Sequence, residues 1–479
     1  MGMAFVPLYV KYLGAEAYGL IGIFALLQAW LALFDLGMTP ALGREMARFR
    51  GGGHSVEAVL DLLRSIEVIG FVIAGLIALG IWGASSWLAS DWLKAGSLPI
   101  DVVANAFAVM GVVTALRFVE SLYRSSIVGL QKQVLLNGVA SVMATLRGAG
   151  AVGVLVWVSP TVGAFFLWQG LMSAISVVIL AVVLYGALPG SSRKARFSMS
   201  SLKGVWRFSA SMVGITFLSL LLTQVDKVLL SRLLSLESFG YYSLAVLVAN
   251  TLYMAVVPIV QAFYPRFTEL VTSGDEQRLI ADYHMGAQLV SVFMGAATGI
   301  LVFHGDALLA LWTGDVVLVQ RVGPLLSVLA VGTFLHGLMW IPYHLQLAHG
   351  WTSLSIRINV IAVMLLVPAI AWSAQHYGAI GAAWAWLILN AGYLLIGVHF
   401  MYKRMLPAEK WRWYWQDIGL PIGASWLVAW LGGRLVQNDL GIAQQLLSLL
   451  GACVLTFVTA VLATGGGRMY LRRCINRVQ

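Results

Sequence analysis

The chain has 479 residues, of which 60% are hydrophobic and only 10% are charged. Soluble domains carry about 25% charged residues, so this composition argues against a soluble enzyme and indicates a protein with many membrane-spanning helices. No polar stretch is long enough to fold as a separate catalytic domain. The formal net charge of +10 must therefore be explained by the segments that connect the helices.

A membrane-spanning helix needs about 20 mostly apolar residues. This rule predicts thirteen spans, at 18–40, 63–84, 102–123, 134–158, 162–187, 208–230, 240–264, 285–312, 322–345, 354–374, 379–401, 413–433 and 443–463. An apolar fragment from Met1 to Val10 precedes them and is too short to cross. We interpret it as part of a first helix, clipped by a missed start codon or by a real truncation, and with it we expect fourteen helices.

Two short motifs occur twice at almost the same offset. Leu13–Gly19 reads LGAEAYG and Leu234–Gly240 reads LSLESFG, 221 positions later. Thr161–Ala164 reads TVGA and Ala379–Ala382 reads AIGA, 218 positions later. Paired structural repeats flanking a site near the middle of the membrane are common in secondary transporters. The repeat therefore predicts two related lobes, with Gly19 superposing on Gly240 and Gly163 on Gly381.

The repeat also predicts how the chain is divided. We expect an all-α membrane protein with an N-terminal lobe of helices 1–6 at 1–188 and a basic cytoplasmic linker at 189–205. A second lobe of helices 7–12 follows at 206–404, and helices 13 and 14 with a basic tail occupy 405–479.

The basic residues are distributed unevenly between the two sides of the predicted membrane. The even-numbered connections and the C-terminal tail hold 21 Lys and Arg residues, whereas the odd-numbered connections hold five. Cytoplasmic loops carry the excess of Lys and Arg, so this bias predicts that both termini are cytoplasmic. The positive charge is thus a topology signal with some affinity for anionic lipid headgroups, rather than a sign of nucleic-acid binding.

Four cations remain inside predicted spans and are our candidate substrate-binding residues. They are Arg117, Arg147, Lys227 and Arg357. Ionisable residues within a span are costly and usually face a cavity or a partner, which makes each a candidate functional group. Together they could line a cationic path, and Arg binds phosphate oxygens with two parallel hydrogen bonds. Such a path would suit a pyrophosphate headgroup.

Structural explanations compete with this one for three of the four. Arg117 has Glu120 one turn away, and the two side chains could neutralise each other. Arg357 lies near the inner end of its span and could extend its guanidinium to the interface. Lys227 adjoins Asp226, although consecutive helical residues point about 100° apart and need not pair.

Arg147 is the strongest single candidate, since it lies in the middle of its span with no acidic residue within two turns. Asp35 and Asp226 are weaker candidates for ion coupling, and Asp35 could equally cap a helix. The histidines lack the spacing of a zinc protease, and no phosphate-binding glycine loop is present. We expect no metal site and no cofactor.

The motifs together resemble a known family. YLGAEAYGL at 12–20, FDLGM at 34–38 and REMAR at 44–48 are similar to the start of the Wzx-type oligosaccharide flippases. Asp226–Lys227, Leu234–Tyr242 and Pro265–Arg266 are similar to helices 7 and 8 of that family. These flippases form the polysaccharide transporter family of the multidrug/oligosaccharidyl-lipid/polysaccharide exporter superfamily. The resemblance covers most of the chain, through motifs that are loose singly and more diagnostic together.

The resemblance implies a non-enzymatic transporter of the bacterial inner membrane with two six-helix lobes and a cationic lumen. It implies alternating access for undecaprenyl-pyrophosphate-linked oligosaccharide repeat units, as in O-antigen and lipopolysaccharide synthesis. A polysaccharide polymerase and a chain-length regulator are the partners that it suggests beside membrane lipids.

Three alternatives stay open. A multidrug exporter of the same superfamily would favour acidic residues in its lumen, and a peptidoglycan-precursor exporter is the other close rival. An O-antigen polymerase, which is a membrane enzyme, would usually carry a large periplasmic loop. The predicted outer loops here are all shorter than about 20 residues, within the connection lengths of compact helical domains or a little above them.

Overall fold

The computed structural model describes residues 2–35, 37–190, 193, 195–351, 353–435 and 442–466, and their side chains except at 2–3, 32, 200–216, 434–435 and 442. Every element named within these residues is a helix, and one isolated backbone bridge joins Lys94 to Ser235. The predicted all-α membrane protein is therefore confirmed. The chain forms two compact units, Met1–Gly240 and Tyr241–Gln479, which are described separately.

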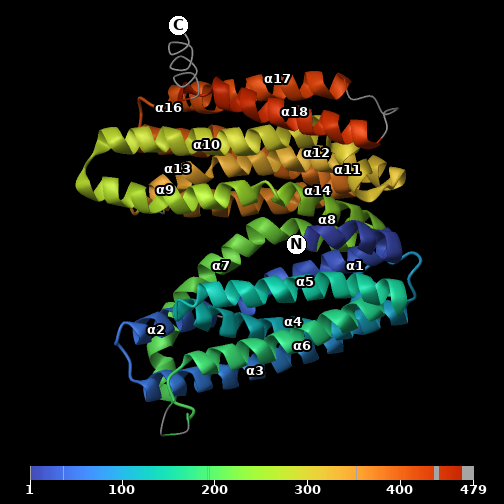
Figure 1. The fold of residues 1–479 in the computed structure, drawn as a ribbon, viewed down its shortest axis with the longest axis vertical. Helices are drawn as coiled ribbons and strands as arrows, with labels where there is room; N and C mark the ends of the chain where they lie inside the picture. The colour runs from blue at the N-terminus through green and yellow to red at the C-terminus, as the bar shows by residue number, and fades with distance from the viewer. Residues whose placement is uncertain are drawn as a thin grey trace. The chain divides into compact units, whose positions relative to one another are not determined.

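The first unit is built from long helices joined by short turns. Its elements are η1 (Gly2–Phe5), α1 (Val6–Phe34), α2 (Met38–Arg50), α3 (Val56–Trp87), the π-helical η2 (Leu88–Trp92), α4 (Ile100–Gly129), α5 (Gln133–Trp157), α6 (Val162–Ala187), α7 (Met199–Leu233) and the start of α8 (Leu236–Asn250). Figure 1 shows α3, α4, α5 and α6 running side by side, with α4 in contact with each of the other three.

The predicted N-terminal fragment is helical and packs inside the first unit. Gly14 has φ 83° and divides α1 into a short first segment and a longer second one. The Tyr9 hydroxyl donates to the carbonyl of Gly148 on α5 at 3.2 Å. A Cβ atom on Gly148 would lie 2.4 Å from the Phe5 ring, so only glycine lets the fragment approach α5 this closely.

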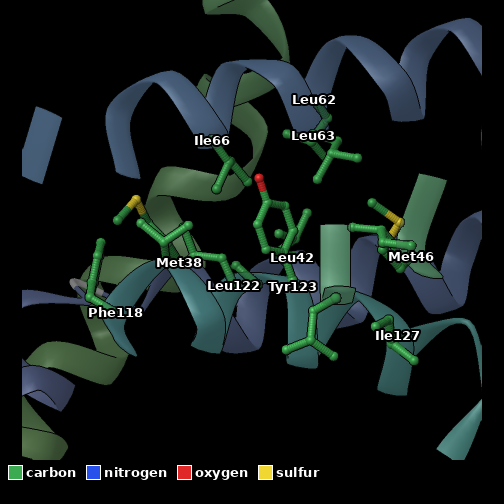
Figure 2. Packing of buried hydrophobic residues seen from close by; sticks show 14 of the residues in the cluster. Met38, Leu42, Met46, Leu62, Leu63, Ile66, Phe118, Leu122, Tyr123 and Ile127 are labelled. Carbon is green, nitrogen blue, oxygen red and sulfur yellow. The ribbon is translucent and has the colours of Figure 1, made fainter. Parts of the chain in front are cut away.

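The core of the first unit lies where α2, α3 and α4 meet. Figure 2 shows Tyr123 of α4 between Leu42 of α2 and the α3 side chains Leu62, Leu63 and Ile66, with its hydroxyl pointing toward α3. These five residues are each no more than 5% exposed. Polar backbone groups cannot be left unpaired in lipid, so packing of complete helices through apolar side chains is the expected solution.

The two copies of the glycine motif meet each other. A Cβ atom on Gly19 would lie 2.3 Å from the carbonyl oxygen of Leu236, and one on Gly240 would lie 2.4 Å from that of Ala15. Helix backbones approach this closely in membranes only through small residues. The repeated glycines are thus a packing requirement, reciprocal between α1 and the first turn of α8.

The connection between α3 and α4 is tied to both copies of this motif. The Glu16 carboxylate accepts from the backbone N–H groups of Gly96 at 2.6 Å and Ser97 at 3.0 Å. Lys94 accepts from the Leu236 N–H at 3.0 Å through its carbonyl, and its ammonium donates to the Leu233 carbonyl at 3.1 Å. This connection therefore fastens the start of the second α1 segment and the α7–α8 turn.

The second unit continues the helical pattern after α8. Its elements are α9 (Tyr253–Ser273), α10 (Glu276–Phe303), α11 (Gly305–Thr313), α12 (Val316–Leu338), α13 (Trp340–Ala348), α14 (Ser353–Gly392), the π-helical η3 (Tyr393–Gly397), α15 (Val398–Met405), α16 (Lys410–Arg412), the π-helical η4 (Trp413–Gly419), α17 (Leu420–Leu435) and α18 (Ile442–Ala463).

Sequence-encoded signals set several boundaries in this unit. The side chains of Asp275 and Asp315 accept from backbone N–H groups in the first turns of α10 and α12, as helix caps do. Gly378, with φ 65°, breaks α14 between the two spans predicted at 354–374 and 379–401. Trp413 of η4 is fully buried against Tyr402 of α15, which anchors the start of the C-terminal helices.

Ten helical stretches of the described residues are long and apolar enough to cross a membrane. One of them, Ser353–Met405, contains two of the predicted spans. The predicted spans at 208–230 and 413–433 are occupied by α7 and by η4 with α17, which are not among the ten. Within the described residues, helices thus account for most of each of the thirteen predicted spans, and the N-terminal fragment forms a further helical segment before the kink of α1 at Gly14.

The compact units divide at Gly240, whereas the repeat places its linker at 189–205. The reason is that α7 packs against α1, α2 and α3. Backbone N–H groups of Arg196 and Ser198, in the linker, donate to side chains of Asp61 and Ser65 on α3 at 2.7 and 2.8 Å. The lobe boundaries derived from the repeat stay a prediction.

The reciprocal glycine contact makes a direct prediction about stability. Gly19→Ala places a methyl group against a backbone carbonyl that cannot move independently, and should destabilise the protein by about 1–3 kcal/mol, the usual cost of overpacking. Gly80→Ala is the matched control, since its Cβ would meet no atom within 4 Å. Thermal unfolding in detergent measures both; equal melting temperatures for the two variants would contradict the contact.

Candidate functional site

The structure places the four predicted cations in different surroundings. Arg117, Arg147 and Lys227 belong to the first unit, and Arg357 belongs to the second. Arg117 on α4 and Arg147 on α5 both contact polar side chains of α6. We call Arg117, Arg147, Glu120, Gln169 and Ser176 the arginine cluster.

Arg147 is held by two other helices. Its Nη2 atom donates to Glu120 Oε2 on α4 at 3.4 Å and to Ser176 Oγ on α6 at 3.2 Å. Its side chain is 20% exposed. The residues within two turns of Arg147 include no acid, because its partner Glu120 lies 27 positions away in the sequence, on a neighbouring helix.

This ion pair changes the interpretation of Arg147. Although no acid lies within two turns of Arg147 in the sequence, Glu120 supplies a countercharge from a neighbouring helix. Glu120 is shared: its other oxygen accepts from Arg124 Nη1 at 3.5 Å, and Arg124 is 44% exposed. One carboxylate therefore faces two guanidinium groups, which leaves the group of three with a net positive charge.

The positions of Arg117 and Glu120, one turn apart on α4, suggested a direct ion pair. In the structure Arg117 binds a different residue. Its Nη2 donates to Gln169 Oε1 on α6 at 3.2 Å. Its guanidinium carbon lies 5.0 Å from the centre of the Phe24 ring of α1, within the range of a cation–π contact. Gln169 is only 5% exposed, so Arg117 is positioned by a buried neutral acceptor and an aromatic face.

A polar stripe on α6 completes the cluster. Gln169, Ser173 and Ser176 follow the spacing of one helix face and are at most 5% exposed. Among the described residues, no protein atom accepts from Nε of Arg117 or Nε of Arg147, and none bonds to Ser173 Oγ. Three buried polar atoms in this neighbourhood are thus without a protein partner, which is unusual enough to require an explanation.

Lys227 and Arg357 lie outside the arginine cluster. The Lys227 ammonium contacts Asp226 Oδ1 at 3.5 Å and donates to the Thr223 carbonyl at 2.9 Å, so the adjacent charges do pair. Arg357 is exposed and lies four residues after the start of α14. That position agrees with a guanidinium reaching the interface. A continuous path through all four cations stays a prediction.

Asp35 acts as a local cap in this structure. Its carboxylate accepts from the Thr39 backbone N–H at 3.0 Å and from the Thr39 hydroxyl. The turn between α1 and α2 needs the left-handed conformation of Gly37, with φ 74°. Of the two roles open for Asp35, these contacts support capping. Ion coupling through Asp35 or Asp226 has no direct support here and stays a prediction.

Two polar features escaped sequence reasoning. Glu67 of α3 is 4% exposed and accepts from the hydroxyls of Tyr123 on α4 at 3.1 Å and Tyr185 on α6 at 2.9 Å. His336 of α12 bonds through Nδ1 to the Tyr253 hydroxyl on α9 at 2.8 Å. A polar residue on the buried face of an otherwise apolar helix is the sequence signal that could have indicated both features, and the same signal marks the polar stripe of α6.

The histidines and acids build no metal centre within the described residues, where no group of three or more His, Cys, Asp or Glu side chains is arranged to hold a metal ion. The polar chemistry of the arginine cluster is that of an anion-binding group, because its cations outnumber its carboxylates.

Comparisons with known proteins relate the chain to proteins of polysaccharide biosynthesis and export. Residues 1–271 match the model of a family described as polysaccharide biosynthesis protein. The chain is 23% identical over 398 residues to a putative O-antigen transporter of Shigella flexneri, covering 82% of this chain and 91% of the relative. It is 25% identical to the lipopolysaccharide biosynthesis protein WzxC of Escherichia coli strain K12, over 48% of this chain and 46% of that relative.

Solved structures show the same fold at low sequence identity. The inward closed conformation of the lipid II flippase MurJ matches with a TM-score of 0.72 at 13% identity, covering 99% of this chain and 97% of that one. An inward-facing multidrug resistance transporter of the MATE family, in the MOP superfamily, matches with a TM-score of 0.64 at 14% identity, over 84% and 94% of the two chains.

The shared carboxylate predicts unequal couplings. A double-mutant cycle of Glu120→Ala with Arg147→Ala should give a coupling energy of about 1 kcal/mol or more, since both side chains are mostly buried. The cycle of Glu120→Ala with Arg124→Ala should give less than about 0.5 kcal/mol, because exposed pairs contribute little. Thermal unfolding of the single and double variants measures both; a larger coupling to Arg124 would refute the assignment.

Proposed function

We propose, from the premise that this chain belongs to the polysaccharide biosynthesis protein family, that it is a flippase for prenyl-pyrophosphate-linked oligosaccharide units. The membrane would be the bacterial inner membrane. The relatives described as an O-antigen transporter and a lipopolysaccharide biosynthesis protein support this substrate class. We propose a transporter that catalyses no reaction of its own.

One observation carries the proposal for the substrate headgroup. Arg117 and Arg147 each bond a protein partner through one terminal nitrogen, Nη2, while their buried Nε–H groups have no partner among the described residues. A diphosphate offers several oxygens per phosphorus and would accept from donors that the protein leaves unused. Guanidinium groups suit this task because their charge persists at any physiological pH.

Glu120 gives the cluster a resting state without ligand. The guanidinium of Arg147 is mostly buried and would be costly to desolvate without a partner, and the Glu120 carboxylate, which also contacts the more exposed Arg124, offsets part of that cost. Its contacts at 3.4 and 3.5 Å are longer than the 2.7–2.9 Å typical of strong charged hydrogen bonds. An incoming diphosphate can therefore compete for Arg147 at a small cost.

Transport would proceed by alternating access, with the cluster exposed to one side of the membrane at a time. The prenyl chain would remain in lipid while the charged headgroup and sugars cross. We propose Asp226 for ion coupling and Lys227 for contact with the headgroup. Arg357 is proposed to contact the headgroup at the inner end of the path. A polysaccharide polymerase and a chain-length regulator are the proposed protein partners.

The alternatives differ in the charge that they require. A drug-cation exporter needs acidic groups left available, whereas Glu67 and Glu120 are both engaged by protein donors. An O-antigen polymerase is disfavoured because the relative that spans 82% of this chain is described as a transporter. A peptidoglycan-precursor exporter shares the diphosphate chemistry, so the transported glycan must be tested directly.

Arg147 provides the central test. Arg147→Ala should reduce export of lipid-linked glycan at least tenfold in cells that depend on this protein, at an unchanged protein level in the membrane. Arg147→Lys should retain partial activity, since it keeps the charge and loses the planar fork. Surface glycan labelling with a quantitative blot of the membrane fraction measures both quantities.

Arg124→Ala is the matched control, because this arginine shares Glu120 and its side chain, 44% exposed, is the more accessible of the two partners. It should export at close to the wild-type rate. Normal export by Arg147→Ala would show that the cluster does not bind the headgroup. A loss that follows reduced protein level in all three variants would instead assign the cluster a purely structural role.

The topology proposal has its own experiment. The proposal that both termini lie in the cytoplasm rests on the 21-to-5 distribution of basic residues between the two sets of connections. Alkaline phosphatase fused after Arg196 or after Arg477 should be inactive, and green fluorescent protein at the same positions should fluoresce. Phosphatase activity at either position would overturn the assignment.

A further inference from the structure

A buried histidine in the second unit lies between two carboxylates. His284 of α10 has a side chain that is 3% exposed. Its Nδ1 atom contacts Asp417 Oδ2 of η4, and its Nε2 atom lies 2.8 Å from Glu409 Oε2, which precedes α16. Both ring nitrogens are therefore occupied by acidic partners from the segment that leads into the C-terminal helices.

The two carboxylates differ in their surroundings. Asp417 is fully buried, and its second oxygen accepts from Gln288 Nε2 of α10 at 2.8 Å. The Glu409 side chain is 20% exposed and also accepts from Arg412 Nη1 at 3.3 Å. Asp417 is thus committed to α10, whereas Glu409 has contact with solvent and a second cation.

The titratable neighbours of this group include tyrosines and Lys410, whose ammonium bonds His399 Nδ1 at 2.8 Å and lies 6.0 Å from the centre of the Tyr414 ring. Tyr283 and Tyr402 share a hydrogen bond of 2.7 Å between their hydroxyls, and the Tyr414 hydroxyl donates to the Leu394 carbonyl at 2.6 Å. Tyrosine is neutral throughout the physiological range. Among the described residues that these ion pairs join directly, the charge depends on His284, Asp417, Glu409 and Arg412.

The hydrogen bonds require more protons than these groups carry separately at neutral pH. Each of the two ring–carboxylate bonds needs one hydrogen, whereas a neutral imidazole carries a single N–H and an ionised carboxylate carries none. Without a further proton, one ring nitrogen would turn a lone pair toward a carboxylate oxygen. With that proton, His284, Asp417, Glu409 and Arg412 sum to zero charge, which suits a buried group.

We propose that His284, Asp417 and Glu409 form a proton-binding site that fastens the inner end of α10 to residues 409–417. The ligand is a proton rather than a metal ion, since no group of three potential ligands in the described residues is arranged to hold one. Glu409 is the route between the site and solvent, because it is the exposed member.

Loss of the proton opens the site at Glu409. Asp417 keeps its bond to Gln288 and one N–H from the ring, whereas Glu409 keeps Arg412 and can turn to solvent. The closed form binds one more proton than the open form, so it is favoured at low pH and the opening constant rises about tenfold for each unit of pH through the transition. This site is independent of the substrate proposed above.

Hydrogen–deuterium exchange of the full-length protein in lipid nanodiscs tests the site. After correction for the intrinsic effect of pH on exchange, peptides covering 406–412 should exchange at least tenfold faster at pH 8.5 than at pH 5.5. Peptides covering the arginine cluster in the first unit should not change. No pH dependence at 406–412 in the wild-type protein would overturn the proposal.

Two variants and one control separate protonation from general loosening. In Glu409→Gln the amide can donate to or accept from the neutral ring, so 406–412 should stay protected at both pH values. Glu276→Gln, on the exposed first turn of α10, should behave as wild type. His284→Gln removes the imidazole that joins the two carboxylates and should also abolish the pH dependence. A wild-type pH response in Glu409→Gln or His284→Gln would refute the assignment.

Discussion

The fold depends on one constraint, which is the cost of leaving a charge or a polar backbone group unpaired away from water. Within the described residues, the buried acids Glu67, Glu120 and Asp417 each bind donors from a different helix. Such pairs are weak evidence for added stability, because desolvation offsets most of their attraction. Their effect is on specificity, since each pair is satisfied at only one rotation and depth of its helices.

Close helix packing is the second means by which these helices are held in register. Lipid is as apolar as leucine, so helices in a membrane associate through shape and through small residues rather than by excluding water. The contact between Gly19 and Gly240 belongs to this class, as does the fit of Phe5 against Gly148. The sequence motif that is repeated in the chain is therefore also the motif at which its two copies touch.

These two constraints separate the functional possibilities. In the arginine cluster the protein leaves guanidinium hydrogens unused beside a polar stripe of α6, which is the arrangement expected where a ligand supplies the missing oxygens. In the His284 group every polar atom named above has a partner, provided that one more proton is bound. The arginine cluster is suited to an anion that binds and is released. The His284 group is suited to a proton that changes how α10 is joined to residues 409–417.

The sequence by itself determined the helices, their approximate ends, the family and the repeated glycine motif. These follow from local properties: the length of apolar runs, the caps Asp275 and Asp315, the breaks at Gly14 and Gly378, and the uneven placement of Lys and Arg. Only the tertiary structure decided that Glu120 pairs with Arg147, that Arg117 turns to Gln169, and that His284 meets Asp417 across 133 positions. Hydropathy specifies which residues enter the membrane, whereas pairing depends on how far each helix is rotated and shifted against its neighbours.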